Sequence, residues 1–218
     1  SDTGKKQEGI TFLLIPMHQE GIEVKPIITL GGAHSVNMVH LTDVKVPVEN
    51  LVGEEGKGWG YAKGLLAHER TGLAGISRSL VALDHLRIQA SGVKRGNATL
   101  LDDPAYKSKL AELEIALLAT EFTELRSLAS AANAAEPGPE SSILKLKGTE
   151  IQQRIQKLTV EAGGIYSAAW GKQPVGHSFA KGGMSGYLSS RAYTIYGGAS
   201  EVQKDVVAKN VLGLKKAK

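Results

Sequence analysis

The chain has 218 residues, of which 42% are hydrophobic, and a formal net charge of +4. This length allows one large domain or two small ones, and the absence of cysteine excludes disulfides, a thiolate nucleophile and cysteine-ligated metal sites. The positive charge owes much to the terminal "LKKAK", which indicates a solvated tail rather than a nucleic-acid-binding arm.

The first 56 residues carry short apolar alternations that are punctuated by glycine and proline, a pattern typical of strands. We expect strands in "GITFLLIP", "EVKPIITL" and "VNMVHLTDVKVP". Three short strands leave edges and apolar faces uncovered. We therefore interpret residues 1–56 as part of a β-domain whose remaining strands precede this chain or come from a partner.

Residues 57–218 change to long segments with helical spacing of apolar residues. A first helix is predicted from about Gly58 to Ala90, and a second begins at Pro104 with Asp103 as its cap. A third ends at Gly163 and Gly164. The apolar stripe of the third helix consists of Leu144, Gly148, Ile151, Ile155, Leu158 and Ala162.

The last predicted helix begins at Ser200, which together with Gln203 matches a capping box, and Gly213 marks its end. Four such segments indicate an antiparallel four-helix bundle. The predicted fold class is α+β, with a partial β-domain followed by an all-α bundle.

One carboxylate interrupts the apolar stripe of the first predicted helix. Glu69 lies four residues from both Leu65 and Leu73, where a leucine is expected. One interpretation is a boundary glutamate paired with a nearby cation such as Arg70. The other is a general base, because an apolar wall disfavours the charged carboxylate and raises its affinity for a proton.

The segment "YTIYGGASEVQK" places two glycines before a helix start. Gly197 and Gly198 allow close approach of the backbone, and the free amides of the helix could face an anionic or carbonyl-rich group. The alternative is an ordinary turn and cap. The histidines show no metal-ligand spacing, so we expect no metal site.

Three stretches, "GGAHSVNMVHLTDVKVPVENLVGEEGKGW", "LLAHERTGLAG" and "YTIYGGASEVQKDVVAKNVLGL", resemble in order and spacing the second half of an acyl-CoA dehydrogenase. The segments between them resemble the bacterial subgroup described as pimeloyl-CoA dehydrogenase large subunits. The resemblance implies a four-helix bundle of that type and a bacterial flavoprotein. The longest apolar runs, "ITFLLIP" and "EIALLA", are too short to span a bilayer, so we expect no membrane span and a cytoplasmic protein.

The family resemblance also implies α,β-dehydrogenation of an acyl-CoA thioester with FAD as cofactor. A glutamate removes the α-proton, and the electrons pass to an electron-transfer flavoprotein. The assembly would be a homotetramer, or a heterotetramer with a related acyl-CoA dehydrogenase chain. If the family layout holds, the chain begins in the middle of the β-domain and is inactive in isolation.

Many members carry the catalytic glutamate in the glycine turn, where this chain has Gly197. A second group places the base in a Glu-Arg pair on the first bundle helix. Glu69 and Arg70 match that pair, so the resemblance implies Glu69 as the catalytic base. Substrate contacts would come from Arg70, Tyr196, Gly197 and Arg191, although a surface ion pair is the alternative for Arg191.

The flavin contacts implied by the resemblance are less complete. Gly198, Ser200 and Glu201 match cofactor-binding positions, but Ala199 replaces the family's threonine. The family's arginine-to-Phe-Gly motif is replaced by "KRGNATLLDD", in which Lys94 or Arg95 could substitute. These departures leave open a second hypothesis, a non-catalytic structural subunit that shares a flavin site with a related chain.

Overall fold

The computed structural model describes residues 4–5, 7–131, 138, 140–169 and 175–214, and for residues 66–73 and 131 it describes the backbone alone. The chain forms two compact units, Ser1–His68 and Glu69–Lys218. The domain boundary that the sequence suggests after residue 56 stays a prediction. Among the described residues, no helix combines the length and apolar character that a membrane crossing requires.

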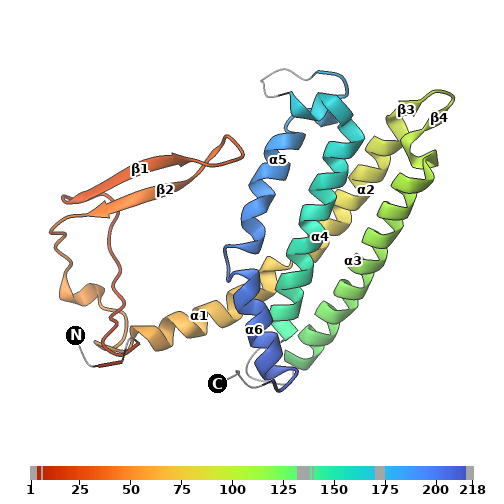
Figure 1. Ribbon diagram of the computed structural model, residues 1–218. Coiled ribbons are helices and arrows are strands. Elements are labelled where there is room, and N and C mark those ends of the chain that lie inside the picture. The colour runs from red at the N-terminus through yellow and green to blue at the C-terminus, as the bar shows by residue number, and fades with distance from the viewer. Residues whose placement is uncertain (1–3, 6, 132–137, 139, 170–174, 215–218) are drawn as a thin grey trace. The chain divides into compact units, whose positions relative to one another are not determined.

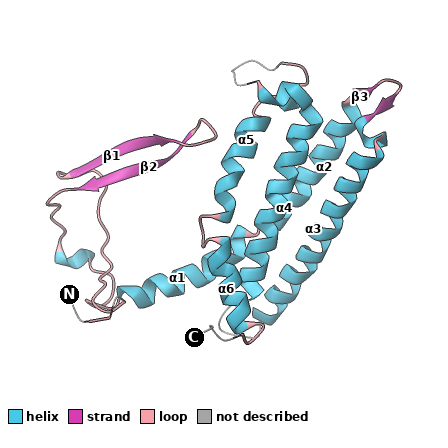
Figure 2. Ribbon diagram, in the orientation of Figure 1, coloured by secondary structure: helices cyan, strands magenta, loops and turns pink. Residues whose placement is uncertain are grey.

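The first unit contains an antiparallel ribbon of β1 (Ile22–Ile28) and β2 (His34–Leu41), in which Ile22 faces Leu41 (Figure 2). The strands predicted in "EVKPIITL" and "VNMVHLTDVKVP" are therefore present, with shifted ends. The turn between the strands is closed by the Gly32 amide, which donates to the Thr29 carbonyl at 2.8 Å. A short 3-10 helix, η1, follows at Val48–Asn50.

The prediction of a strand in "GITFLLIP" is wrong. Residues 10–14 make only isolated bridges, Ile10 with Lys57 and Leu13 with Leu51. Their backbone bonds go to a neighbouring loop, as where the Val52 amide donates to the Phe12 carbonyl at 3.0 Å. Apolar alternation predicts which face is covered, but a regular strand also needs a partner strand of matching length.

The single helix predicted over residues 58–90 is two helices, α1 (Gly58–Leu73) and α2 (Ile76–Gly92). The break lies at Gly75, whose φ of +59° is left-handed. A side chain there would also crowd the Gln152 amide nitrogen at 2.9 Å. The apolar spacing continues across the break, which is why the pattern did not reveal it.

The second unit is a helical bundle around α4 (Glu140–Gly163), as Figure 1 shows. α3 (Pro104–Ala131) begins where predicted, and the Asp103 carboxylate accepts a hydrogen bond from the Ala105 amide at 2.9 Å. Between α2 and α3 lies a small hairpin of β3 (Lys94–Arg95) and β4 (Ala98–Thr99), followed by η2 (Leu100–Asp102). The α+β class with a helical bundle is confirmed.

The segment after α4 contains helices that the sequence pattern did not predict. They are η3 (Gly164–Ala168), η4 (Ser178–Ala180), α5 (Gly183–Ser189) and η5 (Ser190–Thr194). α6 (Ser200–Asn210) begins where predicted, but the capping box is wrong. Ala199 has the extended backbone of the cap, and no side chain caps the helix.

The bundle core is formed by the apolar faces of α2, α3 and α4. The predicted α4 stripe is buried throughout, and Leu144 and Ile151 are almost fully covered. Each fully buried leucine or isoleucine side chain contributes about 1.5–3 kcal/mol relative to an exposed one. The other main contributors are Leu83, Leu86, Leu110, Leu113 and Leu117.

Candidate active site

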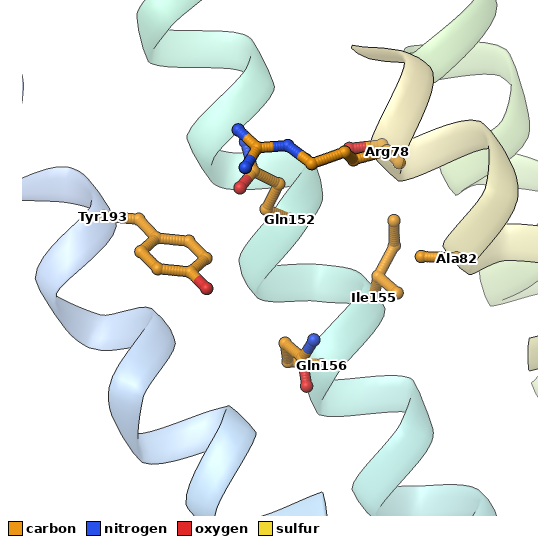
Figure 3. Close-up of a pocket in the computed structure, with 7 residues that line it drawn as sticks. Arg78, Ala82, Gln152, Ile155, Gln156 and Tyr193 are labelled. Carbon is orange, nitrogen blue, oxygen red and sulfur yellow. The ribbon is translucent and has the colours of Figure 1, made fainter. Parts of the chain in front are cut away.

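A cavity of about 160 Å³ lies between α2, α4 and η5 in the second unit. Figure 3 shows the Arg78 guanidinium beside Gln152, the Tyr193 ring across from Ile155, and Gln156 on the remaining side. The residues that line it are Arg78, Ser79, Ala82, Gln152, Ile155, Gln156 and Tyr193. The cavity therefore combines an apolar wall with several polar groups.

The wall next to α2 is shaped by a close helix approach. A side chain at Gly148 would collide with the backbone of Ala74, so α4 packs directly against the break between α1 and α2. The Gln152 amide donates to the Ala74 carbonyl at 2.9 Å. This bond satisfies a carbonyl that the broken helix leaves open, and it fixes Gln152 at the cavity wall.

A second hollow of about 60 Å³ shares Arg78, Gln152 and Tyr193 with the first and is also lined by Lys145 and Tyr196. The Tyr193 and Tyr196 rings pack edge to face, with centroids 5.8 Å apart. Burial raises the pKa of Tyr196, and Tyr193 adds to that rise, whereas the nearby Arg78 charge lowers it.

Lys145 is a fully buried cation next to this hollow. Its ammonium donates to the Tyr193 carbonyl at 3.1 Å. Burial lowers the pKa of Lys145, and the Glu201 carboxylate at the start of α6 acts in the opposite direction. The buried amine thus connects α4 to both η5 and α6.

The glycine turn before α6 has a conformation that other residues rarely adopt. Gly197 and Gly198 have φ values of +62° and +95°. A side chain at Gly198 would collide with the Gln203 amide. Gln203 is fully buried, and neither atom of its amide has a hydrogen-bond partner among the described residues.

Among the described residues, the start of α6 therefore has two kinds of polar groups without a hydrogen-bond partner. The first-turn amides of a helix lack intrahelical acceptors, and no side chain caps them here. The buried Gln203 amide is the second kind. Such groups, with glycines beside them, fit an oxygen-rich or anionic ligand.

Other predicted site residues are distributed along the bundle. Arg191 lies in η5, where its guanidinium stacks 4.3 Å from the Tyr187 ring centroid and donates to the Ser190 hydroxyl at 2.9 Å. Glu69 and Arg70 lie in α1, but their side chains lie outside the described residues. Their predicted roles stay predictions.

Lys94 and Arg95 are exposed in β3 at one end of the bundle, whereas α6 packs beside the other end of α4 (Figure 1). Two hydrogen bonds mark these ends of α4. Near the hairpin, the Tyr106 hydroxyl donates to the Leu158 carbonyl. Near α6, Lys145, which lies thirteen residues before Leu158 on α4, donates to the Tyr193 carbonyl. Thirteen residues of helix span roughly 20 Å. Within one chain, the structure does not bring the hairpin to the glycine turn.

Sequence reasoning missed Arg78, Lys145, Gln152, Gln156 and Tyr193. A signal was present on α4, because polar residues at positions 145, 149, 152 and 156 repeat with helical spacing beside the apolar stripe. A second stripe of this kind on a buried helix indicates a polar site within the bundle.

Residues 56–212 match the family model described as acyl-CoA dehydrogenase, C-terminal domain. Across the whole chain, 31% of residues are identical to acyl-CoA dehydrogenase FadE26 of Mycobacterium tuberculosis. This chain belongs to the acyl-CoA dehydrogenase family. The family resemblance predicted from the motifs is confirmed.

Other relatives of the acyl-CoA dehydrogenase family agree with this assignment. Acyl-CoA dehydrogenase IpdE1 of Mycolicibacterium smegmatis is 29% identical over 96% of this chain and 50% of its own length. FadE26 is matched over 55% of its length. The chain thus spans about half the length of these relatives.

Among solved structures, the Tcur3481-Tcur3483 steroid ACAD matches with a TM-score of 0.86 and 26% identity, over 100% of this chain and 55% of its own. The ChsE4-ChsE5 complex from Mycobacterium tuberculosis matches with a TM-score of 0.84 and 28% identity, over 99% of this chain and 56% of its own. The ChsE4-ChsE5 structure is a complex, as its name states.

Proposed function

We propose that this chain is the C-terminal part of a flavin-dependent enzyme that dehydrogenates an acyl-CoA thioester between its α- and β-carbons. The observation that carries the proposal is the family match over residues 56–212, together with the Glu69-Arg70 pair on the first bundle helix. In this proposal Glu69 is the base that removes the α-proton.

The glycine turn before α6 also supports Glu69 as the catalytic base. Gly197 carries no side chain, so the turn itself offers no carboxylate at the position where many relatives have one. A carboxylate set in an apolar wall has a raised proton affinity, which suits proton removal from carbon. Arg70, Tyr196 and Gly197 would contact the thioester end of the substrate.

The residues at the start of α6 fit FAD, because uncapped amides and the unpartnered Gln203 amide match an oxygen-rich group. Gly198, Ser200 and Glu201 would hold it there. Lys94 and Arg95 lie in the hairpin at the other end of the bundle (Figure 1), so they would contact a cofactor held mainly by another subunit. Bound FAD would accept the β-hydrogen as hydride, and its electrons would leave to an electron-transfer flavoprotein.

A subunit assembly is supported by an apolar stripe that stays exposed on α3. Ile115 and Phe122 are 68% and 60% exposed, and Leu118, Leu125 and Leu128 continue the stripe. Such a face is typical of a surface that another subunit covers. We propose a homotetramer, or a heterotetramer with a related acyl-CoA dehydrogenase chain.

A second candidate function is that of a non-catalytic subunit in such a heteromer. Ala199 removes the hydroxyl that the family's threonine supplies, which weakens the cofactor site. The similarity to the ChsE4-ChsE5 complex favours this alternative as well. In that case a related chain would complete the flavin site and supply the catalytic base.

The deciding experiment uses the full-length protein, purified together with any related chain encoded beside it. Its visible spectrum is recorded without oxygen before and after addition of acyl-CoA thioesters, for wild type, Glu69→Gln and the exposed control Glu49→Gln. We expect the flavin band to bleach in wild type and in Glu49→Gln only. Equal bleaching in Glu69→Gln at equal flavin content would exclude Glu69 as the base, and absence of flavin would favour the structural subunit.

A further inference from the structure

A hydrogen bond from α4 attaches the end of α1 to the bundle. The Gln152 amide donates to the Ala74 carbonyl at 2.9 Å, directly after Leu73, the last residue of α1. The last carbonyls of a helix lack intrahelical donors, and the Gln152 amide supplies one to the buried Ala74. Gly148, one turn earlier on α4, leaves room for the Ala74 backbone. Gly148 and Gln152 together therefore seat the end of α1 on α4.

This attachment lies close to Glu69 along the chain. Glu69 is the first residue of the second unit and belongs to α1, five residues before Ala74. Five residues of helix span roughly 7.5 Å. A helix is a rigid element, so a shift of its end is transmitted to residues one turn away. The backbone of Glu69 therefore moves with the Ala74 carbonyl.

The same helix, α4, holds the segment before the glycine turn in a similar way. The Gln153 amide donates to the Ser190 carbonyl at 2.9 Å. The Lys145 ammonium donates to the Tyr193 carbonyl at 3.1 Å. Both carbonyls belong to η5, which leads toward the turn. Side-chain donors on α4 thus bind the backbone of both segments that carry the candidate site.

We propose that Gln152 is a positioning residue for proton removal, because its bond to the Ala74 carbonyl sets where the Glu69 backbone lies relative to the glycine turn. This inference rests on the proposed function, since it takes Glu69 as the base. Proton transfer requires the two atoms within hydrogen-bond reach, and a misplacement of about 1 Å can cost about 100-fold in rate. Loss of the bond should therefore slow proton removal without weakening substrate binding.

The test uses the full-length protein, purified with any related chain encoded beside it, and two variants at position 152. Gln152→Met keeps the length of the side chain but removes the donor. Gln152→Lys keeps a donor, although the Arg78 guanidinium beside it repels a second positive charge (Figure 3). The matched control is Tyr106→Phe, which removes a comparable bond to the Leu158 carbonyl, at 3.1 Å, elsewhere in the bundle.

The first measurement does not depend on activity. Hydrogen–deuterium exchange, followed by mass spectrometry, reports how often the backbone amides of residues 66–75 open. We expect faster exchange in this segment for Gln152→Met and wild-type exchange for Tyr106→Phe. Unchanged exchange in Gln152→Met would overturn the proposal, because the bond would then not hold the end of α1.

The second measurement separates the rate of proton removal from substrate binding. Butanoyl-CoA, octanoyl-CoA and palmitoyl-CoA are mixed with the protein without oxygen, and the dependence of flavin bleaching on concentration gives a limiting rate constant and a Kd. We expect Gln152→Met to lower the limiting rate about 10- to 100-fold with Kd within about twofold. Gln152→Lys should recover part of the rate, and Tyr106→Phe should match wild type.

An unchanged limiting rate in Gln152→Met, or a loss confined to Kd, would overturn the inference alone if wild type bleaches and Glu69→Gln does not. In the second case Gln152 would be a binding group rather than a positioning residue. If no thioester bleaches wild type, or if Glu69→Gln bleaches as fast, the proposed function fails and this inference fails with it.

Discussion

The Lys145 ammonium donates a hydrogen bond of 3.1 Å to the Tyr193 carbonyl and thereby ties α4 to the segment that leads into the glycine turn. The lysine is fully buried, so the bond forms away from water. Inside a protein such a charge-assisted bond is stronger than at the surface, but burying the amine has its own cost. The position of the turn therefore depends on a group that can titrate.

Replacing Lys145 by methionine tests this link. Burial holds the pKa of Lys145 below the ordinary value of 10.5, so on approach to that pH the unfolded chain retains a proton that the folded chain has lost. Stability then rises with pH in that window. We expect the thermal unfolding midpoint of wild type to rise relative to Lys145→Met as the pH increases toward 10.5.

The control is Lys147→Met, because Lys147 is exposed and pairs only with Glu150 among the described residues. The thermal unfolding midpoint of Lys147→Met should stay parallel to that of wild type as the pH changes. Parallel curves for wild type and Lys145→Met would show that Lys145 keeps its ordinary affinity for a proton.

A second prediction concerns Gly198, whose φ is +95° and whose missing side chain leaves room for the Gln203 amide. Gly198→Ala should lower the free energy of unfolding by about 2–3 kcal/mol, because backbone strain and a steric clash add. Chemical denaturation measures the loss. Gly182→Ala is the matched control, since its φ is +79° and nothing lies within 4 Å of the added atom.

The control variant should lose only about 1 kcal/mol, the part due to the left-handed backbone. The difference between the two variants then reports the contact with Gln203. If both variants lose the same amount, the Gln203 side chain moves freely and the packing argument for this turn is wrong.

A third prediction concerns Tyr106, whose hydroxyl donates to the Leu158 carbonyl at 3.1 Å. Burial raises the pKa of this phenol above its ordinary value of 10.0, and Glu161 adds to the rise. Because the folded pKa exceeds the unfolded one, the stability that Tyr106 contributes is present below pH 10 and is lost as the pH rises further.

Tyr106→Phe should therefore cost about 1 kcal/mol of unfolding free energy at neutral pH, and the difference from wild type should shrink above pH 10. Denaturation curves on both sides of that pH measure it. Tyr166→Phe, at an exposed position, serves as the comparison. A difference that stays constant with pH would contradict the predicted titration.

These features mark what the sequence could and could not predict. The buried stripe of α4 and the start of α3 follow from local spacing and capping chemistry, so they were predictable. The break at Gly75 was not, because the apolar spacing continues across it, and the Gln152 amide that leaves no room for a side chain there comes from another helix. The cap of α6 was assigned to Ser200 rather than Ala199, since side-chain chemistry alone does not reveal which residue has the extended backbone.

The candidate site also has a part that the sequence could predict and a part that it could not. Glu69 and the glycine turn were recognisable from short motifs, whereas the cavity requires α2, α4 and η5 to meet, and no single segment encodes that meeting. The sequence did not single out Arg78, which lines the cavity together with Gln156 and Tyr193. Long-range packing thus decided what local patterns left open.

The last prediction concerns the apolar stripe of α3, in which Leu118 and Phe122 are exposed by 51% and 60%. If another subunit covers this face, two charges placed there would have to be buried without partners, which is costly. The double variant Leu118→Glu and Phe122→Glu should therefore lower the assembly state of the full-length protein, measured by analytical ultracentrifugation. Ala105→Glu, exposed on the same helix but on a different face by helical spacing, should leave the assembly intact. An unchanged assembly in the double variant would mean that the subunits meet through a different face.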